Sequence, residues 1–215
     1  HNKGFADATV NIKILDVPGK DRVDFLINID KNEPYYFGDI SSTGCKLFSE
    51  EKMSSYLGKF IAKSDPYSPM KLREATRYLS NLYGEKGYID AAINYVPKLD
   101  EAGNIYSVTF HIDEGTQYRV GMIKIFGNAV TQSNVILHET LLVPGEIFNS
   151  VKMDHTEKKL YNIGFFENVN VYAVAPNEKS SLGPNYRDVH IEVEEKASTG
   201  QVRFFGAYNQ TASFL

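Results

Sequence analysis

Gly87-Tyr88-Ile89-Asp90-Ala91 is the most informative segment of this 215-residue chain, because variants of it occur at two other places. Gly4-Phe5-Ala6-Asp7-Ala8 precedes it, and Gly164-Phe165-Phe166-Glu167-Asn168-Val169 follows it. Each copy has a glycine, an aromatic residue, any residue and an acid, and an alternating stretch typical of a strand comes next. Repetition of this kind predicts tandem structural units.

A second repeated stretch gives the length of the unit. Ile29 to Tyr35 aligns with Ile112 to Tyr118, and the offset between these stretches equals the offset between Gly4 and Gly87. The third motif, at Gly164, follows the second after a slightly shorter interval. A period of about 80 residues is too long for a solenoid repeat and indicates small domains in tandem.

Each unit is predicted to contain two amphipathic helices. Ser49 and Ser68 are predicted N-caps, and Pro69 suits the first helical position. Gly87 and Gly164 are predicted to follow the second helix of each unit in a left-handed conformation. The apolar positions are Met53, Leu57 and Phe60; Leu72, Ala75, Leu79 and Leu82; Val135, Leu137, Leu141 and Leu142 in a helix from Thr131; and Met153, Leu160 and Ile163 in a helix from Asn149-Ser150.

Three strands complete each unit. They are Tyr35–Ile40, Ala91–Pro97 and Ile105–Asp113 in one unit, and Tyr118–Phe126, Val169–Pro176 and Tyr186–Glu195 in the other. The last strand alternates most regularly, so we expect it at the sheet centre, with the strand before it at an edge that tolerates Pro97 and Pro176. The order strand-helix-helix-strand-strand predicts an α+β fold with two helices on one face of a three-stranded mixed sheet. The residues expected in the cores include Leu57, Leu79, Phe110, Leu141, Leu160 and Ile191.

Residues 1–33 contain only a hairpin, Ala8–Leu15 and Arg22–Asp30, joined by a turn at Val17–Asp21. A lone hairpin without covering helices is marginally stable in water. We therefore expect this segment to be the closing hairpin of an upstream unit.

In this order the motifs resemble the POTRA domains of the BamA family of outer-membrane assembly proteins. The resemblance rests on Leu82-Tyr83 before Gly87-Tyr88, on Leu160 to Val169, on Asp113 to Val120, and on Ile123 to Asn128. The stretch from Ser198 to Tyr208 resembles the passage from the last POTRA domain into the first strand of a transmembrane β-barrel. The domains implied are 1–33, the hairpin of an upstream POTRA domain; 34–115, a POTRA domain; 116–196, the membrane-proximal POTRA domain; and 197–215, a linker and first barrel strand.

The resemblance implies a non-enzymatic scaffold without cofactor or metal at the periplasmic face of the bacterial outer membrane. Its expected partners are unfolded β-barrel precursors, its own C-terminal barrel and accessory lipoproteins similar to BamD. Glu139 matches the family's glutamate in the first helix of the last POTRA domain, which belongs to the face that contacts BamD.

Unpaired backbone groups at a sheet edge suit the binding of an extended client by strand addition. The edge residues expected to bind a client are Ala91, Ile93, Asn94, Tyr95, Val169, Val171 and Tyr172.

Two other functions are compatible with POTRA domains. In a two-partner secretion transporter they capture one exported protein, but the hairpin at residues 1–33 implies a third unit and argues against that class. A division-type POTRA protein has a single membrane anchor, and the alternation from Gly200 to Tyr208 argues against it.

Other chemistry finds little support in the sequence. With 23 Lys and Arg against 27 Asp and Glu, the net charge is −4, and without a basic stripe this argues against nucleic-acid binding. The single cysteine, Cys45, excludes an intrachain disulfide and is expected to be an inert turn residue. His111 and His190 fall in different units, and His138 and His155 lack the pattern of a catalytic cluster.

Overall fold

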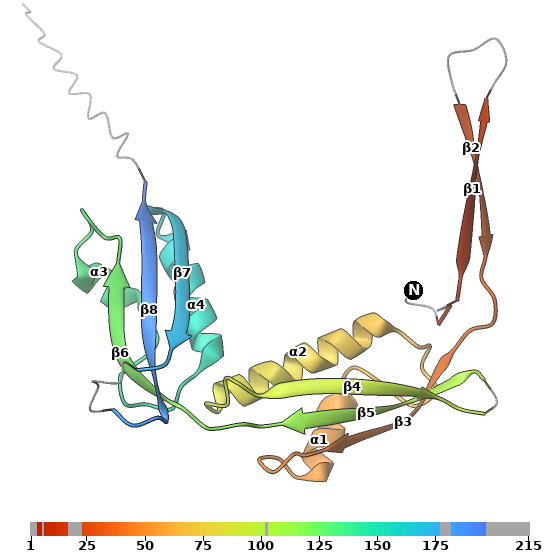
Figure 1. The fold of residues 1–215 in the computed structure, drawn as a ribbon, viewed down its shortest axis with the longest axis horizontal. Coiled ribbons are helices and arrows are strands. Elements are labelled where there is room, and N and C mark those ends of the chain that lie inside the picture. The colour runs from red at the N-terminus through yellow and green to blue at the C-terminus, as the bar shows by residue number, and fades with distance from the viewer. Residues whose placement is uncertain (1–3, 6, 17–22, 102, 177–181, 197–215) are drawn as a thin grey trace, which may run out of the picture.

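The computed structural model describes residues 4–5, 7–16, 23–101, 103–176 and 182–196, as a hairpin followed by two similar units (Figure 1). The hairpin consists of β1 (Thr9–Asp16) and β2 (Val23–Asp30). The first unit contains β3 (Tyr36–Thr43), α1 (Glu50–Leu57), α2 (Pro69–Glu85), β4 (Ala92–Leu99) and β5 (Ile105–Asp113). The second unit contains β6 (Arg119–Phe126), α3 (Ser133–Glu139), α4 (Ser150–Asn162), β7 (Phe166–Val174) and β8 (Tyr186–Glu195).

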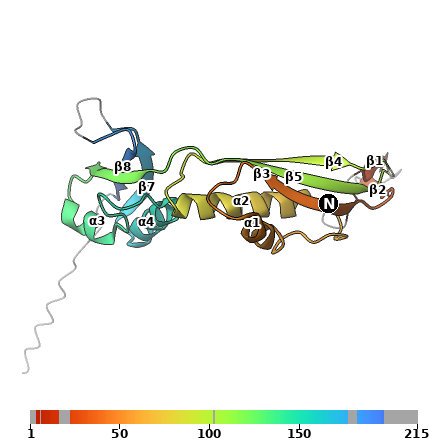
Figure 2. The same ribbon diagram turned by 90° about the horizontal axis from the view of Figure 1, so that it is seen from below.

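Both units have the predicted βααββ order and a mixed sheet. The strand orders are β3-β5-β4 and β6-β8-β7, so β5 and β8 are central and β4 and β7 lie at an edge, as predicted. The central strand runs parallel to the first strand of its unit and antiparallel to its hairpin partner. Both helices of the first unit lie on one face of its sheet (Figure 2).

The local signals in the sequence set the helix limits. Ser49, Ser68 and Asn149 cap α1, α2 and α4, and each accepts a hydrogen bond from the backbone N–H three residues later. Gly87 and Gly164 have φ values of +90° and +85°, which suit the turn after a helix. The predicted core residues Leu57, Leu79, Phe110, Leu160 and Ile191 are all buried.

The apolar face predicted for the first helix of the second unit is wrong. α3 has seven residues and buries Ile136. Two predicted apolar positions are exposed instead, Val135 by 38% and Leu137 by 45%. The backbone becomes extended after Glu139, so Leu141 and Leu142 lie beyond the helix rather than in it. Leu142 is buried, but Leu141, which was predicted to be buried, is only half-buried. Fewer than two helical turns show too little periodicity to reveal a face.

Pro97 also differs from its predicted place. It lies inside β4 rather than at its end, opposite Val108 of β5. β7 ends at Val174, before Pro176.

The hairpin exposes an apolar face. Alternate residues of β1 and β2 share one side of the pair, and each is 54% to 63% exposed: Val10, Ile12, Ile14, Phe25, Ile27 and Ile29. The predicted turn at residues 17–21 and the segment 197–215 lie outside the described residues. Within the described part of the chain, no helix is both long and apolar enough to cross a bilayer.

A carboxylate at the end of each central strand anchors the loop between the first strand and the first helix. Glu114 accepts hydrogen bonds from the N–H groups of Lys46 (2.7 Å) and Leu47 (2.8 Å) and from the Tyr83 hydroxyl (3.0 Å). Burial alone would raise the pKa of Glu114, but these donors hold it below its usual value.

Glu195 does the same in the second unit. It accepts from the N–H groups of Thr131 (2.6 Å) and Val130 (2.9 Å), and these donors, Thr131 above all, lower its pKa. The two carboxylates therefore stabilise corresponding loops, and both require the ionised form.

Glu114→Gln is expected to lower the free energy of unfolding at pH 7 by about 1–3 kcal/mol, because a charged acceptor of three hydrogen bonds is lost. The pKa of Glu114 is lower in the folded state, so its contribution is complete above the unfolded pKa of about 4.3 and lost as pH falls through the folded value. Thermal unfolding between pH 7 and pH 3 should show a shallower acid loss in the variant. Glu85→Gln, on the exposed end of α2, is the control; equal acid slopes in all three proteins would contradict the anchor.

Candidate functional site

Most of the predicted edge residues could contact a partner through their backbone groups rather than through their side chains. The side chains of Ile93, Val169 and Val171 are buried, at 9%, 7% and 5% exposure. Asn94 is exposed, and Tyr95 is half-buried against Phe110. Ala91 precedes β4, and Tyr172 is half-buried with its hydroxyl donating to Glu192 (2.5 Å).

The direction of the backbone groups of β4 follows from Pro97. In an antiparallel pair, alternate residues point both N–H and C=O toward the neighbouring strand or away from it. Pro97 has no N–H, so it suits an outward position, and Ile93 and Tyr95 share its parity. Asn94 has the opposite parity and faces His111 of β5, so its N–H belongs to the ladder rather than to the open edge.

β7 has the same position in its sheet, but its edge is partly closed. The N–H of Val171 donates to the Glu157 carboxylate of α4 at 2.9 Å. An added strand would have to displace Glu157 from this N–H. No local sequence pattern signals this bond, because it joins a helix side chain to backbone 14 residues later.

β3 and β6 form the opposite edges of the two sheets, and at the start of each strand a loop hydrogen-bonds to its outward backbone groups. Beside β3, Phe37 donates to the Asp65 carbonyl and its own carbonyl accepts from Ser64 N–H, each at 2.8 Å. Beside β6, the N–H of Val120 donates to the Glu146 carbonyl (2.9 Å), and its carbonyl accepts from Gly145 (2.8 Å). Among the described residues, the outward groups of Ile93 and Tyr95 in β4 make no such bond.

Glu139 is already paired within its own unit. Its carboxylate lies 2.8 Å from Lys159 Nζ on α4 and 3.3 Å from His138 Nδ1, and its side chain is 25% exposed. The hydrogen bond from Lys159, followed by that from His138, lowers the pKa of Glu139. A partner cation at this site would compete with Lys159.

Asp188, a fully buried carboxylate of β8, has a structural role. It accepts hydrogen bonds from Lys124 Nζ and from Met122 N–H, both at 2.9 Å, opposite the irregular part of β6. Burial raises the pKa of Asp188, but Lys124 and Met122 outweigh it and hold the pKa below its usual value. A carboxylate satisfied in this way is held ionised and is a poor general acid.

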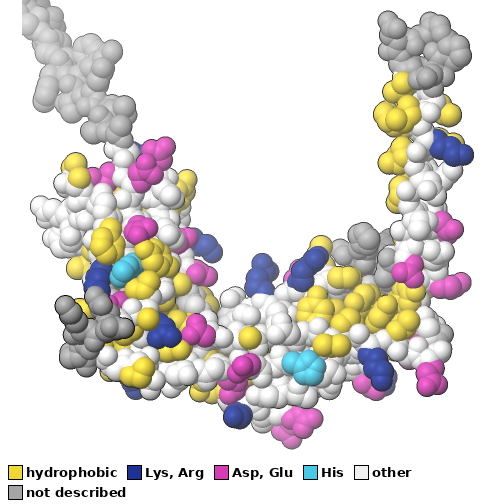
Figure 3. Space-filling view, viewed as in Figure 1, with side chains coloured by type: hydrophobic (Ala, Val, Ile, Leu, Met, Phe, Trp, Pro, Cys, Tyr) yellow, Lys and Arg dark blue, Asp and Glu magenta, His cyan; other side chains and the backbone are white. Residues whose placement is uncertain are grey.

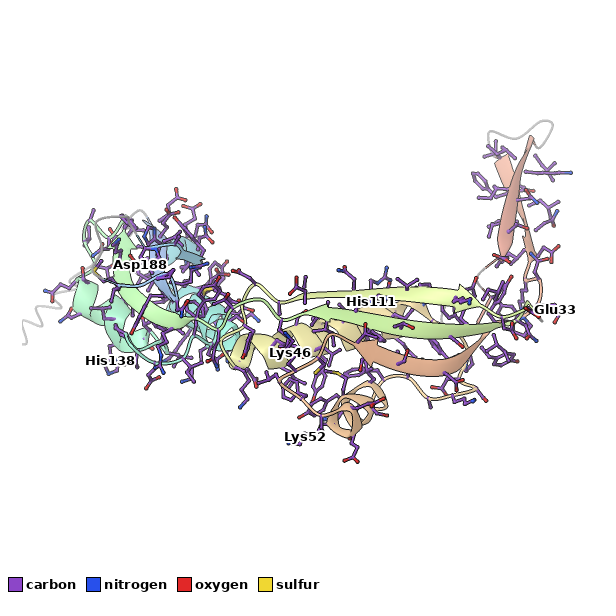
Figure 4. All side chains as sticks on the ribbon, turned by 60° about the horizontal axis from the view of Figure 1, so that its bottom comes forward. Glu33, Lys46, Lys52, His111, His138 and Asp188 are labelled. Carbon is purple, nitrogen blue, oxygen red and sulfur yellow. The ribbon has the colours of Figure 1, made fainter. Side chains whose placement is uncertain are left out.

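The thiol of Cys45 is also accounted for locally. Cys45 is half-buried and donates to the Phe48 carbonyl at 3.1 Å, and its sulfur lies 3.1 Å from the Tyr83 hydroxyl oxygen. His111 and His138 lie in different units (Figure 4). Within the described residues, no three His, Cys, Asp or Glu side chains gather as they would around a metal.

The repeated glycine motif forms the joint between the two units. Gly87 accepts a hydrogen bond from Tyr118 N–H at 2.9 Å, and Asp90 lies 3.6 Å from Arg187. Gly84, in the last turn of α2, packs so closely on α4 that a Cβ there would lie 2.0 Å from Ser150 Oγ.

The joint after the hairpin repeats this pattern. Gly4 accepts from Tyr35 N–H at 2.8 Å, and the Tyr35 hydroxyl donates to Asp7. The sequence revealed the motif as a repeat but not as a contact between neighbours, because the partner tyrosine belongs to the next unit and lies far along the chain.

Comparison with known proteins gives a consistent result. The family model POTRA, described as "Surface antigen variable number repeat", matches residues 35–115 and 118–196. The chain is 24% identical over 204 residues to the outer membrane protein assembly factor BamA of Buchnera aphidicola, covering 94% of this chain and 32% of that protein. It is 24% identical over 198 residues to BamA of Neorickettsia risticii, covering 91% and 25%. The chain thus spans about a quarter to a third of the length of these relatives.

Solved structures agree with the fold. The crystal structure of Haemophilus influenzae BamA POTRA3-5 superimposes with a TM-score of 0.67 at 22% identity, covering 90% of this chain and 75% of that chain. BamA from Haemophilus ducreyi lacking POTRA domains 1-3 gives a TM-score of 0.63 at 21% identity, covering 75% and 30%.

Gly84→Tyr is expected to loosen the joint, because the side chain would occupy the space of Ser150. Helix propensity favours tyrosine over glycine here, so the fold of the first unit should survive. Spin labels on α2 and α4 should give a broader distance distribution in the variant. Ser80→Tyr, on the exposed side of α2, is the matched control; identical distributions in both variants would contradict this role.

Proposed function

This chain belongs to the POTRA family, and from that membership we propose that it is a non-enzymatic periplasmic scaffold for the assembly of β-barrel proteins in the bacterial outer membrane. The support is its similarity, over nearly its whole length, to part of proteins named outer membrane protein assembly factors. Its two sheets, each covered on one face only, suit binding rather than catalysis.

The scaffold binds unfolded β-barrel precursors by strand addition, chiefly at β4. The observation that carries this proposal is a contrast among the four outer strands. One residue in each of β3, β6 and β7 has outward backbone groups bonded within the chain, whereas the outward groups of Ile93 and Tyr95 make no such bond among the described residues. Main-chain bonds suit a client set of varied sequence. Binding is expected to be weak, because an extended peptide loses conformational entropy on binding.

The domain organisation follows the same reasoning. Residues 34–115 and 116–196 are the two POTRA domains, and 197–215 lead into the barrel. The exposed apolar face of β1 and β2 supports the assignment of residues 1–33 to an upstream POTRA domain, whose helices would cover it as α1 and α2 cover β4 and β5.

An accessory lipoprotein similar to BamD binds the second unit at Glu139, in competition with Lys159. The alternative function is that of a two-partner secretion transporter, which captures one exported protein. Capture of several unrelated barrel precursors by the same edge would separate the assembly factor from the transporter.

Titration of the isotope-labelled chain with an alternating barrel-strand peptide is expected to shift the amides of β4 more than those of β7. In Glu157→Ala, the amide of Val171 should exchange faster with solvent, and the peptide shifts should extend to β7 because its edge is opened. Asp154→Ala, on the exposed surface of α4, is the control. Shifts confined to the helices, with β4 and β7 silent, would rule out strand addition.

Charge reversal separates the two roles of Glu139. Glu139→Lys should weaken co-purification of the lipoprotein with little change in melting temperature, since like charges would meet at the contact. The double variant Glu139→Lys, Lys159→Glu restores the internal ion pair but leaves a positive charge at position 139. Recovery of binding in the double variant would show that only the internal pair matters.

A further inference from the structure

The end of the second unit, as far as the structure describes it, differs from the surface on which the first unit packs against its neighbour. In both units the N–H of the motif glycine donates to the carbonyl three residues earlier, which belongs to Gly84 in one and Tyr161 in the other, at 3.3 and 3.2 Å. The two residues therefore occupy corresponding places. Gly84 leaves room for Ser150 of the next unit, whereas Tyr161 fills that place and is 57% exposed.

The other positions that form the joint in the first unit also differ from their counterparts in the second unit. A Cβ at Gly87 would meet Tyr118 and Ile147 within 3 Å, but a Cβ at Gly164 would meet none of the residues that the structure describes within 4 Å. After β5 the chain turns at Gly115, with φ +65°, and returns to Gly87. After β8, Lys196 continues the ladder instead, and its N–H donates to the Phe165 carbonyl at 3.0 Å.

Three exposed apolar side chains surround the point at which the chain leaves β8. Phe165 is 53% exposed and lies beside Lys196, four residues after Tyr161 and beyond the end of α4. Val130 is 87% exposed, and its N–H is held by Glu195 on the other side of the strand. Hydrophobic and acidic side chains lie side by side at this end of the second unit (Figure 3).

We propose that this terminal surface, formed by Val130, Tyr161 and Phe165, inserts into the headgroup region of the membrane. The proposal rests on the proposed function, in which residues 197–215 lead into the barrel. Four residue steps separate Lys196 from Gly200, where the alternation typical of a barrel strand begins, so the surface is held within about 14 Å of the first residue of that strand. Tyrosine and other aromatic side chains are enriched in this interfacial layer.

The charges nearby set the type of lipid contact. Glu167, Glu194 and Lys196 are exposed on the same end of the sheet, so two negative charges accompany one positive charge and anionic headgroups gain no net attraction. Contact therefore depends on the apolar side chains and should be insensitive to salt.

The chain contains no tryptophan, so a single introduced one reports on its own site. Phe165→Trp is compared with Val143→Trp. Val143 has a similar exposed fraction (50%) but lies in the loop that packs against the start of β6, away from the end of β8. Both proteins are held by a C-terminal His-tag on phosphatidylcholine vesicles that contain a nickel-chelating lipid and a lipid with a quencher near the headgroup. Quenching is expected to be several-fold stronger at position 165; equal quenching would overturn the proposal.

Loss of the side chains gives an independent test. Without the tag, the double variant Tyr161→Ser, Phe165→Ser should bind vesicles about tenfold more weakly, with unchanged melting temperature. Unaltered binding, or binding abolished by salt in the parent protein, would also overturn the proposal. The peptide titration at β4 is independent of this surface, so failure of the lipid contact and failure of strand addition are distinguishable.

Discussion

The carboxylate that ends each central strand holds the unit together at the point where its chain segments converge. Glu114 and Glu195 bind the backbone of the loop that leads into the first helix, and thereby fix that helix over the sheet. The turn glycines Gly44 and Gly127 allow this approach, since a Cβ at either would lie about 2 Å from a carbonyl oxygen of the central strand. With this end fixed, the residues after the carboxylate determine how the chain leaves the unit.

The outer strands of the two units differ in which of their outward backbone groups are bonded within the chain. A mixed sheet of three strands has two edges, and exposed edges invite unwanted pairing. In this chain loops cover the first strand of each unit at its start, and a helix carboxylate covers β7. These bonds obstruct strand addition at the start of β3 and β6 and at Val171 of β7, so the proposed client site lies chiefly at β4.

Much of the fold could be predicted from the sequence because it depends on local signals. The repeat, the helix caps and the regular alternation of β5 and β8 determine the order and the central strands. The face of α3 could not be predicted, since seven residues carry too little periodicity. The closure of β7 by Glu157 and the fit of Gly84 to Ser150 depend on contacts between distant segments, which no local pattern reports.

Tandem units with the same backbone provide an internal comparison of residues in equivalent places. Where both units keep a feature, as with the strand-end carboxylates and the positive φ of Gly87 and Gly164, the fold itself requires it. Where they differ, the fold permits either residue, and the difference reflects the contacts that each unit must make. Tyr161 in place of a packed glycine is such a case: the helix end is retained, but Tyr161 is exposed where Gly84 packs against Ser150 of the next unit.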